Sequence, residues 1–184
     1  AGRAGFDVTV MDDRETYANR ERFPQAKEVI AQDFERTFAG LAINDSSYLV
    51  IVTRGHRDDM RILRLAVQTN AKYIGMVGSR RKAITVFREL TREGLKPELF
   101  DRVHSPIGLD IGASSPEEIA VSILAELIGV RRGVERPLPH MSWFLQHGAD
   151  PADPAKVDTK SDDQSSRTET DPVQPPQSHT AAIR

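Results

Sequence analysis

Apolar positions along the chain form short runs separated by segments with helical spacing. Residues 7–11 are a predicted strand, because β-branched residues alternate there up to two aspartates, and residues 26–31 are a shorter strand candidate. Residues 48–53 form a continuous apolar run, which is typical of a central parallel strand buried on both faces. Residues 72–77 repeat this pattern and are followed by Gly78, so a second buried strand is expected there.

The segments between these runs carry apolar residues at helical spacing. Two such sets are Met60, Leu63 and Val67, and Ala83, Val86, Phe87 and Leu90. The clearest helix should begin after Ser115 as N-cap, with Glu118 completing a capping box, and should end before Gly133. Its apolar residues predict a wide apolar arc. Alternating strands and helices indicate an α/β fold, a Rossmann-like parallel sheet with helices on both faces.

Composition changes near residue 149, where Pro, Asp, Ser, Thr and Gln become dominant. Too little apolar surface is present there to offset the entropy of ordering. We therefore expect one domain over residues 1–148 and a disordered tail over residues 149–184. The chain starts without Met, directly ahead of the first predicted strand, and we expect it to be truncated at this end.

Composition and charge exclude several classes of protein. The 184 residues carry 25 Lys and Arg against 27 Asp and Glu, a net charge of −2, which gives no global attraction to nucleic acid or membrane. Without cysteine the chain holds no disulfide, thiolate metal site or cysteine nucleophile, and a reducing cytoplasm, our expected location, is compatible with this. No apolar run approaches the roughly 18 residues of a membrane span.

Ligands of open parallel sheets bind outside the carboxyl ends of the strands. This rule selects three groups of candidate residues that follow predicted strands. They are Asp12 and Asp13, then Thr53, Arg54, Gly55 and His56, then Gly78, Ser79, Arg80, Arg81 and Lys82.

The cations at Arg80, Arg81 and Lys82 would lie in the first turn of a helix, where they oppose the helix dipole at a cost of about 0.3–1 kcal/mol each. A bound phosphate would reverse that sign, because free N–H groups and side-chain charges would converge on it. A solvated basic turn is the alternative, and residue type alone leaves both interpretations open.

The turn over residues 53–59 is mixed in charge. Gly55 would permit close backbone approach or a positive φ, and Asp58 or Asp59 suits a helix N-cap. Arg54 could reach a phosphate or carboxylate. His56 could be an acid or base near neutral pH, although hydrogen bonding within its own loop is the commoner role.

Asp12 or Asp13 could hydrogen-bond a ribose, as an acidic residue does at the end of the second strand of a dinucleotide-binding unit, or both could be solvated carboxylates. Pro106, Gly108 and Gly112 predict a fixed irregular loop. Asp110 within it could orient a ligand or an arginine, with a structural role favoured, and His104 is interpreted as a satisfied strand-end histidine. The residue pattern indicates no catalytic constellation and no metal-ligand cluster.

Four segments together resemble the C-terminal Rossmann-like domain of the XdhC/CoxI family, the maturation factors of xanthine and carbon monoxide dehydrogenases. They read VMDDR at residues 10–14 with FP at 23–24, VTRGH at 52–56, YIGMVGSRRK at 73–82, and VHSPIGLDIG at 103–112 running on to SPEEIA at 115–120. The resemblance covers roughly residues 5–133.

The resemblance implies an accessory factor, not an enzyme, that binds molybdenum cofactor as cargo and helps load it into a molybdenum hydroxylase. The cofactor's phosphate would bind the basic turn at Arg80 to Lys82, with Thr53, Gly78 and Ser79 adding hydrogen bonds. Implied partners are the apo-hydroxylase, a cysteine desulfurase or sulfurtransferase, and a second copy in a homodimer.

The chain departs from the family by lacking an N-terminal domain, a first strand and a Gly-rich turn, so a gap in the sheet is expected. The alternatives are an NAD(P)-binding oxidoreductase, for which the chain shows no convincing acid/base pair, and a nucleotide-sensing regulatory domain.

Overall fold

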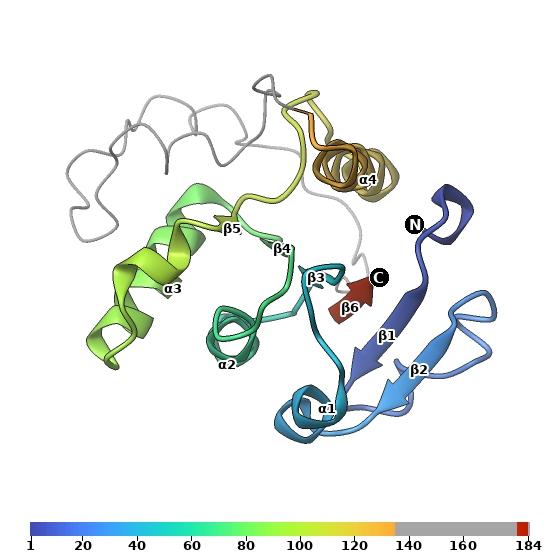
Figure 1. Cartoon of the computed structure of the whole chain (residues 1–184), viewed down its shortest axis with the longest axis horizontal. Helices are drawn as coiled ribbons and strands as arrows, with labels where there is room; N and C mark the ends of the chain where they lie inside the picture. The colour runs from blue at the N-terminus through green and yellow to red at the C-terminus, as the bar shows by residue number, and fades with distance from the viewer. Residues whose placement is uncertain (135–179, 184) are drawn as a thin grey trace, which may run out of the picture.

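The fold is a six-stranded sheet with helices on both faces, in a computed structural model that describes residues 1–134 and 180–183 (Figure 1). The strand order is β2-β1-β6-β3-β4-β5. The strands are β1 (Val8–Asp12), β2 (Glu28–Ala31), β3 (Tyr48–Ile51), β4 (Tyr73–Met76), β5 (Val103–His104) and β6 (Thr180–Ile183). The helices are α1 (Phe34–Gly40), α2 (His56–Ala66), α3 (Arg80–Arg92) and α4 (Pro116–Arg132), with 3-10 turns η1 (Gly2–Ala4) and η2 (Pro97–Phe100).

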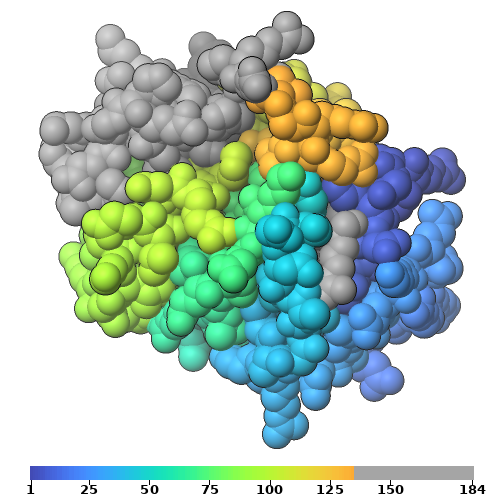
Figure 2. Space-filling view, viewed as in Figure 1, coloured from blue at the N-terminus to red at the C-terminus, as the bar shows by residue number. Residues whose placement is uncertain are grey.

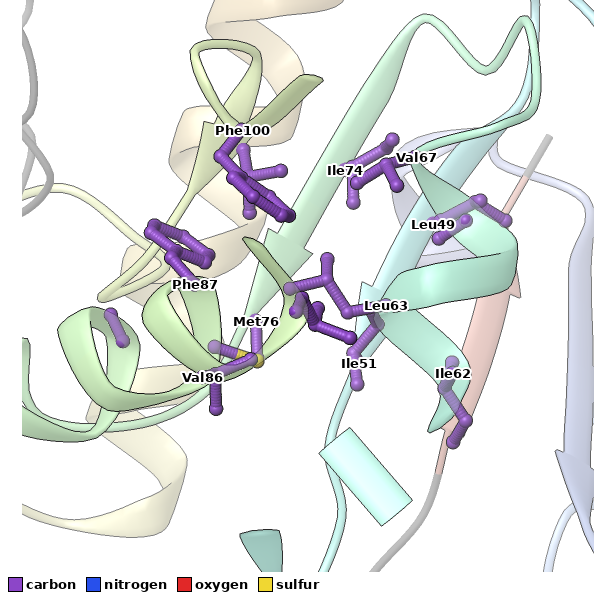
Figure 3. Packing of buried hydrophobic residues seen from close by; sticks show 14 of the residues in the cluster. Leu49, Ile51, Ile62, Leu63, Val67, Ile74, Met76, Val86, Phe87 and Phe100 are labelled. Atoms are coloured by element: carbon purple, nitrogen blue, oxygen red, sulfur yellow. The ribbon is translucent and has the colours of Figure 1, made fainter. Parts of the chain in front are cut away.

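Helices α1, α2 and α3 cover one face of the sheet, and α4 lies on the opposite face (Figure 1). Fully buried Ile51, Leu63, Met76 and Phe87 form the centre of this larger core (Figure 3). The Phe87 ring stacks on Phe100 of η2 with centroids 4.9 Å apart. The continuous apolar runs of the central strands are thus explained by burial on both faces.

The other face is covered by α4. Leu127 of this helix packs with Tyr48, Tyr73 and Ile107 in the smaller core. A β-carbon at Gly75 would lie 2.3 Å from Ile107 Cδ1, so the absence of a side chain there lets the loop after β5 approach β4. The predicted capping box of Ser115 and Glu118 and the end at Gly133 are confirmed.

The four predicted strands and three predicted helices are confirmed, with ends that differ by a few residues. Helix α1 and the two-residue strand β5 were not predicted, because both are too short to show a periodic pattern. The expected apolar arc of α4 is only partly correct: Ser122 and Glu126 are buried, whereas Val121 is 59% exposed. No helix in the described part of the chain is long and apolar enough to cross a membrane.

Strand β6 lies between β1 and β3, antiparallel to both, in the gap that was expected to stay open. Within the predicted tail, only the main chain of Thr180–Ile183 belongs to the described residues, as strand β6, so the prediction of a disordered tail stays a prediction. The rest of the predicted tail, and residues 135–148 of the predicted domain, lie outside the described residues.

Candidate functional site

The carboxyl ends of β1, β3 and β4 lie at one edge of the sheet, since β6 is antiparallel to both β1 and β3 and β4 is parallel to β3. This edge carries the three groups of candidate residues. A small hollow lined by Asp12, Asp13, Thr53 and Asp58, among others, joins the ends of β1 and β3. In the space-filling view, α3 in yellow-green, the α2 region in green and cyan, and the N-terminal strands in blue follow one another across the surface (Figure 2).

The Asp12 carboxylate is held in place by hydrogen bonds from Arg14. Its side chain accepts hydrogen bonds from the Arg14 main-chain N–H and Nε on Oδ1, at 3.0 and 2.8 Å, and from Nη2 on Oδ2 at 3.0 Å. Asp12 is 3% exposed, and the Arg14 guanidinium lies 3.9 Å from the centroid of the Tyr17 ring. These contacts favour a role for Asp12 in orienting Arg14 over direct contact with a ribose.

Asp13 is the exposed carboxylate of the pair. Burial raises the pKa of its carboxyl, and the neighbouring charge of Asp12, a hydrogen bond with Asp12 and the charge of Asp58 raise it further, while Arg14 lowers it. Three carboxylates therefore lie near one another between β1 and α2. This part of the edge disfavours an anion and leaves Asp13 available as a hydrogen-bond acceptor for a hydroxyl.

Lys82 is directed into the protein. Its Nζ lies 2.5 Å from Oδ2 of Asp59, which is 0% exposed, and Thr53 Oγ1 donates a 2.6 Å hydrogen bond to the other carboxylate oxygen. A β-carbon at Gly78 would lie 2.8 Å from Lys82 Cδ, so the glycine makes room for this side chain. The charge of Lys82 is thereby neutralised from within, which weakens its predicted role as a phosphate ligand.

The start of α2 differs from the prediction, because neither Asp58 nor Asp59 caps the helix and the interpretation of either as an N-cap is wrong. The N-cap is Gly55, with an extended φ of −157°, so the positive-φ alternative for this glycine is wrong too. A β-carbon at Gly55 would meet no atom within 4 Å. The main chain therefore faces open space at the start of α2, where no side chain caps the helix.

An open pocket of about 820 Å³ lies at this helix terminus, lined by Arg54, Gly55, His56, Arg57, Asp58 and Arg61. Arg61 is engaged by Asp33 and Glu35. In the described part of the chain, Arg54 and Arg57 form no ion pair, and both are exposed. The Arg54 guanidinium lies 6.0 Å from the Tyr17 ring centroid. Two arginines and an uncapped helix terminus thus face one pocket.

His56 Nε2 lies 2.8 Å from Oε2 of Glu89, which links the start of α2 to α3. This ion pair or hydrogen bond spans two helices, so the expectation of a bond within its own loop is wrong. In the described part of the chain, Glu89 is the side chain that pairs with the His56 ring.

Arg80 and Arg81 are exposed in the first turn of α3, and that turn contains no acidic residue. Ser79 is the N-cap of this helix and accepts a hydrogen bond from the Lys82 main-chain N–H. The Ser79 hydroxyl is therefore engaged in capping α3. Of the three predicted cations, Arg80 and Arg81 are exposed, and Lys82 points inward.

Asp110 is exposed in the loop between β5 and α4. Among the described residues no hydrogen bond or ion pair joins it to the other candidates. The loop itself is fixed as predicted: the Gly108 N–H donates to Glu126 Oε2 at 2.7 Å, and Ser122 Oγ donates to the Leu109 carbonyl at 2.7 Å. None of these contacts involves Asp110, so the structural role favoured for this residue stays a prediction.

A buried polar network on α4 was missed by the sequence reasoning. Glu126 accepts hydrogen bonds from Tyr73 Oη at 2.6 Å and from the Gly108 N–H, and its Oε1 lies 2.8 Å from His104 Nδ1. Burial acts to raise the pKa of Glu126, but the partner groups led by His104 outweigh burial and lower it. Burial first, and then Glu126, raise the pKa of Tyr73 well above its usual value. The interpretation of His104 as a satisfied strand-end residue is confirmed.

Comparison with known proteins places this geometry in a family. Residues 1–127 match the family model described as the XdhC Rossmann domain. The chain is 33% identical over 132 residues to the uncharacterized protein YqeB of Escherichia coli K12, covering 71% of this chain and 24% of that protein. It is 34% identical over 134 residues to a Bacillus subtilis 168 protein named as a probable xanthine dehydrogenase subunit, covering 73% of this chain and 38% of the relative.

The crystal structure of a xanthine dehydrogenase from Bacillus halodurans has a similar fold, with a TM-score of 0.59 and 33% sequence identity. The match covers 69% of this chain and 37% of that one. The chain thus spans well under half the length of these relatives. The resemblance deduced from the four motif segments is confirmed, and the chain belongs to the XdhC Rossmann domain family.

Proposed function

We propose that this chain is the cofactor-binding domain of an accessory factor that binds molybdenum cofactor and helps load it into a hydroxylase of the xanthine dehydrogenase type. Support comes from the family and from a relative that is named a probable xanthine dehydrogenase subunit. The observation that carries the proposal is the pocket at the start of α2, with Arg54 and Arg57 beside an uncapped helix terminus.

The pocket fits the chemistry of a phosphorylated pterin. Its volume of about 820 Å³ lies in the range of roughly 300–1,000 Å³ that small-molecule sites occupy. Guanidinium groups bind phosphate oxygens in pairs, and the free N–H groups at a helix N-terminus add donors with a favourable dipole. We therefore assign the phosphate to Arg54 and Arg57 in preference to Lys82, whose ammonium is paired with Asp59.

The role of the protein in this proposal is to hold the cargo and not to transform it. Arg54 and Arg57 bind and orient the phosphate, the main chain at Gly55 approaches it closely, and Asp13 accepts a hydrogen bond from a ligand hydroxyl. Partners that follow from the proposal are the apo-hydroxylase, a sulfurtransferase that supplies sulfur, and a second copy of the chain in a homodimer.

The structure makes the alternative of an NAD(P)-dependent oxidoreductase or nucleotide sensor weaker. Of the two carboxylates that could bind a ribose, Asp12 is buried and hydrogen-bonded to Arg14 through both oxygens, which leaves only Asp13 for that role. Titration with NAD(H) under the same conditions separates these functions from cofactor loading.

The test is an anaerobic titration of the full chain with molybdenum cofactor, followed by absorbance. We expect Arg54→Ala/Arg57→Ala to weaken the Kd about tenfold or more, because a hydrogen bond to a charged group contributes about 1.5–3 kcal/mol. Arg80→Ala/Arg81→Ala removes the same charge from the first turn of α3 and is the matched control. The same variants are then compared in activation of the apo-hydroxylase.

A larger loss of cofactor affinity in the Arg80→Ala/Arg81→Ala variant would indicate that the phosphate binds at the start of α3. Saturable binding of NAD(H) without binding of the molybdenum cofactor would instead favour the sensor or oxidoreductase. Unchanged cofactor affinity in both double variants would contradict an anion site at this edge.

A further inference from the structure

A side-chain hydrogen bond joins the two ends of the turn that lines the pocket at the start of α2. Thr53 Oγ1 donates to Asp59 Oδ1 at 2.6 Å and lies 3.1 Å from the Gly55 carbonyl oxygen. The Asp59 main-chain N–H donates to the same carbonyl at 3.1 Å. The pocket-lining residues at positions 54–58 lie between the two bonded ends. The bond between Thr53 and Asp59 thus closes the segment that forms the wall of the pocket.

The Asp59 carboxylate is held in turn by α3, which packs beside α2 (Figure 1). Lys82 of α3 places its Nζ 2.5 Å from Asp59 Oδ2 and 3.5 Å from the Val77 carbonyl oxygen, which follows β4. Asp59 is 0% exposed and is therefore out of reach of a ligand in the pocket. The three side chains of Thr53, Asp59 and Lys82 form a clasp that connects the ends of β3 and β4 to two helices.

Stability alone does not explain a carboxylate at this buried position. A buried ion pair must overcome the cost of removing both charges from water, and apolar side chains of similar volume often replace such a pair without loss of stability. An apolar side chain at position 59 would not supply an acceptor for the Thr53 hydroxyl. This difference points to a role of Asp59 in the conformation of the turn.

We propose that the clasp positions Arg54, Gly55 and Arg57 for anion binding, with Asp59 as a positioning residue that does not contact the ligand. Anion recognition at a helix N-terminus needs N–H and guanidinium groups directed at one point, and ordering a loose turn on binding lowers the affinity. The clasp orders the turn before the ligand arrives, because it fixes both ends. The inference rests on the anion site proposed above, whichever phosphorylated compound occupies that site.

The test compares two double variants of the full chain that differ only at position 59. Asp59→Leu/Lys82→Met breaks the clasp, whereas Asp59→Asn/Lys82→Met keeps a side-chain oxygen that accepts from the Thr53 hydroxyl. Both variants lack the Lys82 ammonium and have the same net charge. A difference between them therefore reports the acceptor at position 59 and not the loss of a phosphate ligand at position 82. Urea unfolding establishes first that both chains are folded.

The first measurement reads the order of the turn in the absence of ligand. Trypsin cleaves after arginine, and cleavage within a folded segment requires local opening. We expect the bond after Arg54 to be cut at least about fivefold faster in Asp59→Leu/Lys82→Met than in Asp59→Asn/Lys82→Met, the factor that loss of one typical hydrogen bond implies. Mass spectrometry of the digest measures both rates. The bond after Arg92, at the far end of α3, is the internal reference and should be cut equally in both chains.

The second measurement is a calorimetric titration with inorganic pyrophosphate, a probe that presents phosphate groups without a pterin. Asp59→Leu/Lys82→Met should bind pyrophosphate at least about fivefold more weakly than Asp59→Asn/Lys82→Met, because its turn must be ordered on binding. The comparison is then repeated with molybdenum cofactor under anaerobic conditions.

A second pair of variants tests the clasp from its other end and leaves the ion pair of Asp59 and Lys82 intact. Thr53→Val removes the hydroxyl, and Thr53→Ser retains it. We expect faster cutting after Arg54 and weaker pyrophosphate binding in Thr53→Val, and rescue of both in Thr53→Ser. This pair decides the question if a position-59 variant does not fold.

Faster cutting after Arg54 together with weaker pyrophosphate binding in the variants without the clasp supports the proposal. Equal cutting in the matched variants would show that the clasp does not order the turn, and equal affinity despite faster cutting would show that this order does not serve binding; either outcome overturns it. Loss of affinity in Thr53→Val without faster cutting would mean that Thr53 contacts the anion directly, which also overturns the positioning role.

These outcomes separate the clasp from the proposed function. Clasp-dependent binding of pyrophosphate without any binding of molybdenum cofactor would support the positioning role and contradict cofactor loading. Equal affinities of the matched variants for the cofactor would leave cofactor loading intact and overturn the positioning role. A wild type that binds neither compound would overturn the anion site and the positioning role together.

Discussion

Replacing Glu126 by alanine should lower the free energy of unfolding by about 3–5 kcal/mol, the loss expected when one partner is removed from a buried polar or ionic network. Tyr73 Oη, the Gly108 N–H and His104 Nδ1 would all lose their common partner inside the protein. Urea unfolding of the two chains measures the difference. Glu117→Ala is the matched control, because Glu117 is exposed in the first turn of the same helix.

The same network predicts a pH dependence. Because the folded pKa of Glu126 lies below its ordinary value of 4.5, its charge stabilises the fold above that value, and the contribution is lost as pH falls through the folded pKa. Glu126→Gln should therefore be less stable than the wild type at neutral pH, and the difference should shrink in acid. A difference that stays constant from neutral pH down through this acidic range would show that the carboxylate charge is not what stabilises the loop after β5.

Replacing Lys82 by methionine should cost about 3 kcal/mol, the lower end of the range for a broken buried ion pair, because Lys82 is still 28% exposed. Asp59 Oδ2 accepts no hydrogen bond, so the ammonium is its only compensation among the described residues. The double variant Asp59→Leu/Lys82→Met should recover most of the loss, since no buried charge is left unpaired. Thermal or urea unfolding of the single and double variants measures the coupling.

Arg81→Ala is the control for this series, because it removes a cation from the same helical turn without touching Asp59. Its stability should stay within about 0.5 kcal/mol of the wild type, as is usual for surface substitutions. A Lys82→Met chain as stable as the wild type would mean that the ion pair contributes nothing. Lys82 would then be available as a phosphate ligand, as the sequence pattern suggests.

Local features of this protein could be predicted from the sequence because their causes lie within a few residues. The apolar runs of β1, β3 and β4 indicate that these strands are buried. The capping box of α4 depends on two residues only three positions apart. The motif segments that identify the family are local in the same sense. Turn residues at the carboxyl ends of parallel strands could also be named, because topology alone brings them to one edge.

The partners of those turn residues could not be predicted in the same way. Lys82 and Asp59 lie on different helices, and only the packing of α2 against α3 brings the ammonium to the carboxylate. The Glu126 network joins residues 53 positions apart. Its one sequence signal was the presence of Glu126 and Ser122 within the apolar pattern of α4, which indicates polar groups that need buried partners.

The sequence by itself determined strands β1 to β4, helices α2, α3 and α4, the edge at which a ligand is expected and the family, because spacing and local sterics specify these. Tertiary structure alone decided which cations face the pocket: Arg54 and Arg57 at the start of α2, with Lys82 turned inward. It also decided that Thr180–Ile183 pairs with strands far away in the chain. The physical reason is that a buried charge or an unpaired main-chain group is costly, and its partner can come from any segment that folding brings near.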